Sequence, residues 1–94
     1  MLKKTVKMTY KCGMHGRPSL AVVNTANMFD KSIKIHLESK GKKIDARSIL
    51  MLMSIGIMYG DEVTIIIDGG TEYGEKRAML ALINLFENNF FMDV

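Results

Sequence analysis

The chain has 94 residues, of which 48% are hydrophobic and 24% charged, and its formal net charge is +3. This length suits one compact domain over residues 1–94, and the globular composition excludes disorder and fibrous repeats. The basic residues are spread from Lys3 to Arg77 instead of forming a block, which favours acidic protein partners over nucleic acid.

The single cysteine and the first residues of the chain indicate the compartment. Cys12 can form no internal disulfide, and no partner stands at zinc-site spacing, so we expect neither a metal nor a cofactor. The first residues lack the continuous apolar run and the small-residue cleavage site of a signal peptide. No stretch approaches the roughly 20 apolar residues of a membrane span. The sequence therefore predicts a cytoplasmic protein without membrane insertion.

The first two elements predicted along the chain are a strand and a helix. Apolar and polar residues alternate over 5–10, the period of a half-buried strand. Pro18 has a φ suited to a first helical turn, and valines and alanines follow at helical spacing. We therefore expect a strand over 5–10 and a helix over about 17–28.

A hairpin and a short helix are predicted next. Alternation returns over 33–38, residues 39–42 have turn chemistry, and a short strand surrounds Ile44. From Ser48 to Ile55 the chain is almost wholly apolar, beginning with a serine and followed by a glycine, as in a short capped helix.

The last two elements are a strand and an amphipathic helix. The strand lies between Gly60-Asp61 and Gly69-Gly70 and alternates around isoleucines. In the helix, Ala78, Leu82 and Leu85 follow helical spacing, and the helix is expected to end near Phe90.

The order β-α-β-β-α-β-α predicts the fold class. Alternation with polar residues outward suits an antiparallel sheet that has one face covered and one face in water. We therefore expect an α+β open-faced β-sandwich, with a four-stranded antiparallel sheet and three helices on one face.

The stretch over residues 13–19 reads Gly-Met-His-Gly-Arg-Pro-Ser and carries the clearest chemistry. His15 stands just ahead of a predicted helix, whose first free N–H groups form an anion site. A neutral imidazole is nucleophilic near pH 7 and can attack phosphorus. The Arg17 side chain and the N–H groups of Gly16 and Arg17 could bind phosphate oxygens. An isolated string of this kind is more often an ordinary loop histidine beside a solvated arginine.

This stretch resembles the active-site signature of the HPr family of phosphocarriers, which is Gly, aliphatic, His, small, Arg, Pro, small. The resemblance covers residues 5–86, and residues 46–57 are similar to the regulatory-serine region of the family. Two residues depart from the family pattern. Gly16 replaces the usual Ala, Thr or Ser, and Leu20 replaces a small residue.

The resemblance implies that phosphorylated Enzyme I transfers a phosphoryl group to Nδ1 of His15, that Arg17 stabilises it, and that Enzyme IIA domains receive it. It further implies that Ser48 is phosphorylated by a bifunctional HPr kinase/phosphorylase, and that the modified carrier joins a catabolite-control repressor. The alternative for Ser48 is a role only as a helix N-cap. The partner-binding residues expected from the resemblance are Leu20, Ile49, Leu50 and Met53.

Two other functions compete with the phosphocarrier. One is an HPr-like regulatory or interaction module that is not dedicated to sugar transport. The other is a small hydrolytic enzyme that uses His15 and an acid such as Glu75, which is disfavoured because this length leaves no enclosed pocket. A carrier is not an enzyme in the usual sense, since it is the substrate of one partner and the donor to the next. A monomer is sufficient for that role.

Overall fold

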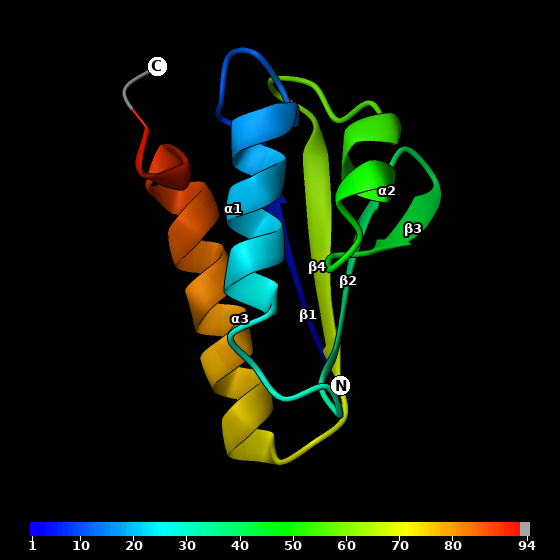
Figure 1. Ribbon diagram of the computed structural model, residues 1–94, viewed down its shortest axis with the longest axis vertical. Helices are drawn as coiled ribbons and strands as arrows, with labels where there is room; N and C mark the ends of the chain where they lie inside the picture. Colours follow the sequence, from blue (N-terminus) through cyan, green and yellow to red (C-terminus); the bar gives the residue numbers. More distant parts are fainter. Residues whose placement is uncertain (93–94) are drawn as a thin grey trace.

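The computed structural model describes residues 1–92 and has the predicted element order, followed by one short 3₁₀ turn. Figure 1 shows the arrangement of the elements. The elements are β1 (Leu2–Lys7), α1 (Gly16–Ala26), β2 (Lys34–Ser39), β3 (Lys42–Asp45), α2 (Ile49–Ser54), β4 (Glu62–Asp68), α3 (Glu72–Glu87) and η1 (Asn89–Phe91).

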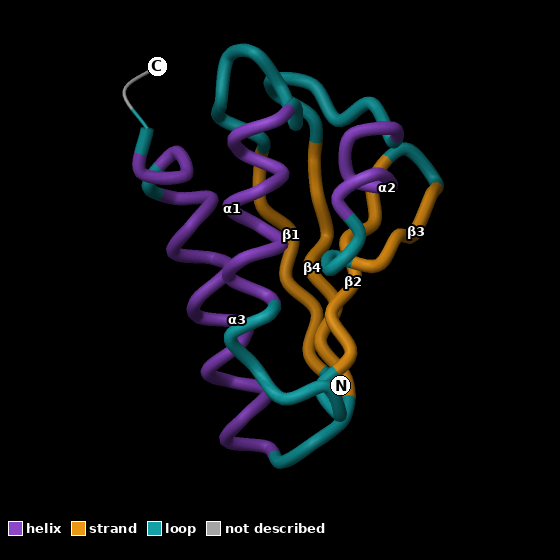
Figure 2. The backbone as a smooth tube through the Cα atoms, in the orientation of Figure 1, coloured by secondary structure: helices purple, strands orange, loops and turns teal. Residues whose placement is uncertain are grey.

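The four strands form one sheet in the order β1-β4-β2-β3, and every neighbouring pair is antiparallel. The three helices gather on one side of this sheet, as the ribbon and the tube both show (Figures 1 and 2). The predicted open-faced sandwich is therefore confirmed. Within residues 1–92, no helix has the length and apolar character needed to cross a membrane.

The core lies between the sheet and the helices. Strand β4 lies between β1 and β2, and its Val63, Ile65 and Ile67 face the helices without measurable exposure. Leu52 of α2 and Leu82 of α3 are buried against this face. Each such side chain contributes about 1.5–3 kcal/mol by leaving water. The core therefore fixes where the ends of α1 and α2 stand.

The strand predicted over 5–10 is wrong in its bounds, because β1 spans Leu2–Lys7. Lys7 pairs with Glu62, the first residue of β4, so the ladder has no further partner strand. Met8 still exchanges hydrogen bonds with the turn before β4, donating to the Asp61 carbonyl at 2.8 Å and accepting from the Gly60 N–H at 2.8 Å. Its side chain is buried in the core although the strand ends one residue earlier.

The two long helices also end earlier than predicted. Helix α1 ends at Ala26, and α3 ends at Glu87. Phe90 follows in η1 with a φ of 58°, a left-handed conformation that cannot continue an α-helix. Its ring packs edge-on against Phe86, with the ring centroids 4.9 Å apart.

Candidate functional site

His15 is the N-cap residue of α1, and its side chain is free of capping hydrogen bonds. The backbone is extended, with φ −97° and ψ −162°, and the residue is exposed. Its carbonyl accepts the Ser19 N–H at 3.0 Å, and its N–H donates to the Gly13 carbonyl at 2.9 Å. The backbone at His15 is therefore fixed while the imidazole remains open to a reacting group.

The backbone on either side of His15 is held from below. Gly13 has a φ of +79°, and a Cβ at this position would stand 2.9 Å from the Ile57 carbonyl oxygen. The Met14 N–H donates to that same oxygen at 2.9 Å, and its side chain is buried. The buried Ser19 hydroxyl donates to the Met14 carbonyl at 3.1 Å. The His15 loop, residues 11–16, therefore rests on the loop after α2.

The start of α1 offers two free amides. The N–H groups of Gly16 and Arg17 have no acceptor within residues 1–92, whereas the Ser19 N–H is bonded to His15. Pro18 stands between Arg17 and Ser19 and has no N–H to leave unpaired. Two backbone donors and the positive end of the helix dipole thus stand next to His15.

Arg17 adds a free guanidinium to these amides. The residue is exposed, and in the described part of the chain its side chain makes no hydrogen bond or ion pair. Its five N–H donors are therefore available for an anion. At Gly16, a Cβ would meet no atom within 4 Å, so the methyl of an alanine would fit this backbone.

Ser48 caps α2, as its sequence position predicts. Its Oγ accepts the Met51 N–H at 3.4 Å, and its backbone N–H donates to the Asp45 carbonyl at 3.0 Å. The preceding Arg47 donates through its guanidinium to the carbonyls of Phe29, Asp30 and Ile33. Because of these bonds, Arg47 ties the start of α2 to the chain that follows α1.

The predicted partner-binding residues differ in exposure. Leu50 is 78% exposed, Leu20 and Met53 are also exposed, and Ile49 is half-buried. The sequence pattern did not single out Met51, Met58 and Tyr59, which are exposed as well. For Met51 the signal was that residues 49–53 hold more apolar side chains than one buried face can cover, whereas Met58 and Tyr59 lie outside that run.

A lysine and an aspartate hold the loop after α2. Lys40 Nζ donates to the Gly56 carbonyl at 2.6 Å and lies 3.2 Å from Asp61 Oδ2. The same Oδ2 accepts the Met58 N–H at 2.8 Å. This hydrogen bond first, and the Lys40 ammonium second, lower the pKa of Asp61 below its ordinary value. Neither residue belongs to a sequence motif, so both were missed.

Glu75 lies at the other end of the molecule from His15. Its Oε2 accepts the Gly69 N–H at 2.8 Å, and its Oε1 lies 3.4 Å from the Met1 ammonium. Figure 1 shows the start of α3 and the start of α1 at opposite ends of the fold. The acid considered for a hydrolytic reaction therefore does not stand beside the histidine.

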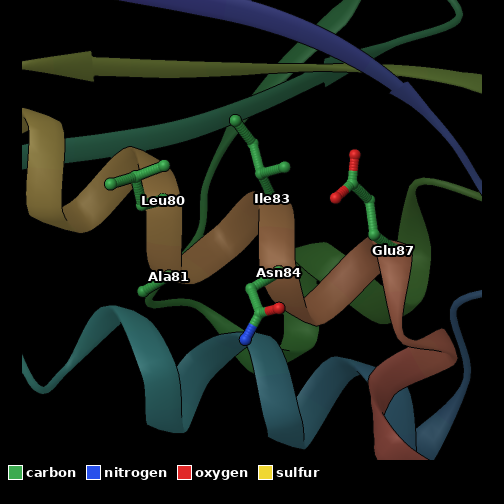
Figure 3. A pocket seen from close by; sticks show the side chains of 5 residues that line it. All are labelled: Leu80, Ala81, Ile83, Asn84 and Glu87. Atoms are coloured by element: carbon green, nitrogen blue, oxygen red, sulfur yellow. The ribbon is translucent and has the colours of Figure 1, made fainter.

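A hollow of about 420 Å³ opens on the surface of α3, apart from these residues. In Figure 3, Ile83 points toward the strands, whereas Asn84 points toward α1. The residues that line this hollow include none of the predicted site residues. The candidate site is accordingly the open N-terminus of α1 and the surface around it.

The sequence has recognisable relatives. Over residues 2–88 it matches the family described as "PTS HPr component phosphorylation site". The "HPr-like protein Crh" of Halalkalibacterium halodurans is 37% identical over 83 residues, which cover 88% of this chain and 96% of that protein. The "Phosphocarrier protein HPr" of Xylella fastidiosa is 34% identical over 93 residues, which cover 99% of each chain.

Solved structures resemble the fold over its full length. The crystal structure of HPr-C-His from Thermoanaerobacter tengcongensis has a TM-score of 0.88 at 34% identity, and 100% of each chain is covered. An HPr dimer from the same organism has a TM-score of 0.71 at 36% identity, covering 96% of this chain and 98% of the other. Sequence and fold thus lead to the same group of proteins.

Proposed function

Since the chain belongs to the HPr family of the phosphotransferase system, we propose that it carries a phosphoryl group on His15, accepted from phosphorylated Enzyme I and donated to Enzyme IIA domains. One observation carries the proposal. His15 is the exposed N-cap residue of α1, and beside it stand two amides and an arginine side chain that have no partner within residues 1–92. A carrier of this kind turns nothing over alone, and we expect it to act as a monomer in the cytoplasm.

The proposed transfer is a substitution at phosphorus. The lone pair of the neutral imidazole Nδ1 forms the new nitrogen–phosphorus bond, while the bond from phosphorus to the donor's leaving group breaks. The protein's contribution is to position and stabilise charge. The amides of Gly16 and Arg17 and the guanidinium of Arg17 would hold the phosphoryl oxygens.

We propose that partners dock on the apolar surface around this site, through Leu20, Ile49, Leu50 and Met53. Weak, rapidly exchanging contacts suit a carrier that must leave each partner after transfer. Phosphorylation of Ser48 by an HPr kinase/phosphorylase would add about −1.5 to −2 charges beside this surface. That change would weaken docking to Enzyme I and, under the same proposal, allow binding to a catabolite-control repressor.

A regulatory module is the second candidate function. The observation in its favour is the similarity to an HPr-like protein named Crh, at 37% identity. In that case Ser48 would be the main site of modification, and sugar transport would not depend on the chain. The presence of His15 with its free amides favours the carrier.

The deciding experiment is mass spectrometry after incubation with phosphoenolpyruvate and Enzyme I. We expect one acid-labile phosphate on the native chain and none on His15→Ala. His36→Ala is the matched control, because the chain has two histidines and His36 lies half-buried on β2. If the native chain stays unphosphorylated while a known carrier reacts, the carrier proposal is wrong. Kinase treatment, with Ser48→Ala as the control, then tests the regulatory module.

A further inference from the structure

Three of the nine methionines are exposed on α2 and the loop that follows it. The exposed fractions are 47% for Met51, 44% for Met53 and 50% for Met58. We call these three residues the methionine cluster. By contrast, the methionines of the core, Met8 among them, are almost completely buried.

The methionine cluster adjoins the His15 loop. The Met58 sulfur lies 3.6 Å from the position that a Cβ would take on Gly13, two residues before His15. The preceding carbonyl, of Ile57, accepts the Met14 N–H. Met51 and Met53 lie on α2, which contacts α1 and is followed directly by the loop that contains Ile57 and Met58. Met58 therefore stands beside the His15 loop, and Met51 and Met53 lie exposed on the neighbouring helix.

We propose that the methionine cluster is an oxidation-sensitive site, at which a peroxide converts the thioethers to sulfoxides and so lowers the rate of phosphoryl transfer to His15. This inference rests on the proposed function. In each step the sulfur lone pair attacks one peroxide oxygen and the O–O bond breaks. The sulfur is oxidised by two electrons, and hydrogen peroxide is reduced to water.

The physical effect is a change of polarity at the docking surface. A thioether is apolar and adaptable, so a partner can cover it without loss. A sulfoxide oxygen needs hydrogen-bond donors, and an apolar partner surface that covers it leaves it unsatisfied. The effect should therefore raise the KM of Enzyme I for this chain, while kcat changes little. We expect kcat/KM to fall about tenfold when all three sulfurs are oxidised.

The experiment needs a background without the exposed thiol of Cys12, because peroxide oxidises thiols as well. Cys12→Ser protein would be treated with dilute hydrogen peroxide, and peptide mass spectrometry would locate the sulfoxides. Phosphorylation by Enzyme I and phosphoenolpyruvate would then be compared with the untreated sample. Treatment with methionine sulfoxide reductases should restore the original KM.

Two variants in the Cys12→Ser background identify the responsible sulfurs. Met51→Leu, Met53→Leu and Met58→Leu are combined in the first variant, which should change within about twofold on treatment, each rate being compared with its own untreated sample. Met28→Leu is the matched control. Met28 is exposed but follows α1, at the end of that helix away from His15 (Figure 1), so this variant should remain as sensitive as its parent.

Three results would overturn the inference. The first is an unchanged KM although all three sulfoxides have formed. The second is an equal loss in the triple leucine variant. The third is a loss explained by unfolding, seen as a collapse of the far-ultraviolet circular dichroism at the assay temperature. If the untreated chain is not phosphorylated at all, the proposed function is wrong, and the inference about methionine oxidation is wrong with it.

Discussion

At the level of single residues, substitution of Arg17 should impair phosphate binding without lowering the stability of the fold. Its guanidinium has no partner in the described chain, so Arg17→Ala should leave the melting temperature unchanged. Hydrogen bonds to charged groups contribute about 1.5–3 kcal/mol, so transfer to His15 should slow about 10- to 100-fold. Arg17→Lys should be intermediate, because an ammonium cannot reproduce the planar fork. Stopped-flow phosphorylation with Enzyme I measures the transfer rate of both variants. Native rates for Arg17→Ala would remove Arg17 from the site.

Two glycines that flank His15 make a matched pair. Gly13→Ala should lower the free energy of unfolding by about 1–3 kcal/mol, because it requires a positive φ and brings Cβ to 2.9 Å from the Ile57 oxygen. Gly16→Ala should be neutral or slightly stabilising, since the position is open and alanine favours helix. Urea unfolding of both variants tests the difference. Equal losses would show that the His15 loop does not depend on its contact with Ile57.

At the level of elements, the bond between Asp61 and the loop after α2 predicts a pH dependence. The folded pKa of Asp61 lies below its unfolded value, so the carboxylate stabilises the fold above the ordinary pKa of about 4. This contribution is lost as the pH falls through the lowered folded pKa. Asp61→Asn removes it, so the native chain should exceed the variant in stability at about pH 6 and lose that advantage toward about pH 2.

Urea unfolding of both proteins across this pH range measures the effect. Asp30, whose pKa is also lowered, chiefly by the Ser32 N–H, is present in both chains and cancels in the comparison. A stability difference that is constant with pH would contradict the assigned role of Asp61.

The elements also separate what the sequence could and could not predict. His15, Arg17 and Ser48 belong to local patterns, so the sequence alone could propose them as site residues, and the structure shows Ser48 as a helix cap. The end of β1 could not be predicted in this way, because it depends on where β4 begins, some 55 residues later at Glu62. Lys40 is a turn residue with a φ of +54°, and its side chain contacts Gly56 and Asp61. Nothing in the local sequence indicates that contact.

At the level of the whole molecule, the two edge strands predict a monomer. Strand β1 exposes Lys3, Lys4 and Lys7, and β3 exposes Lys42 and Lys43. Lysines on an edge strand oppose pairing with a second sheet. Light scattering during size-exclusion chromatography should therefore give the mass of one chain at micromolar concentration. A stable mass of two chains would mean that this protein associates, as the T. tengcongensis HPr dimer does.

The position of Met1 gives the molecule a direction. The first residue pairs with Glu75 at the end of the fold opposite His15 (Figure 1). If the chain is attached through its amino terminus to a surface, a bead or a fused domain, His15 would therefore lie at the end of the molecule that faces solution. Attachment at the amino terminus replaces the Met1 ammonium by an amide and removes its ion pair with Glu75, so a spacer should separate the attached group from the chain. The chain could then be displayed in a uniform orientation for interaction measurements.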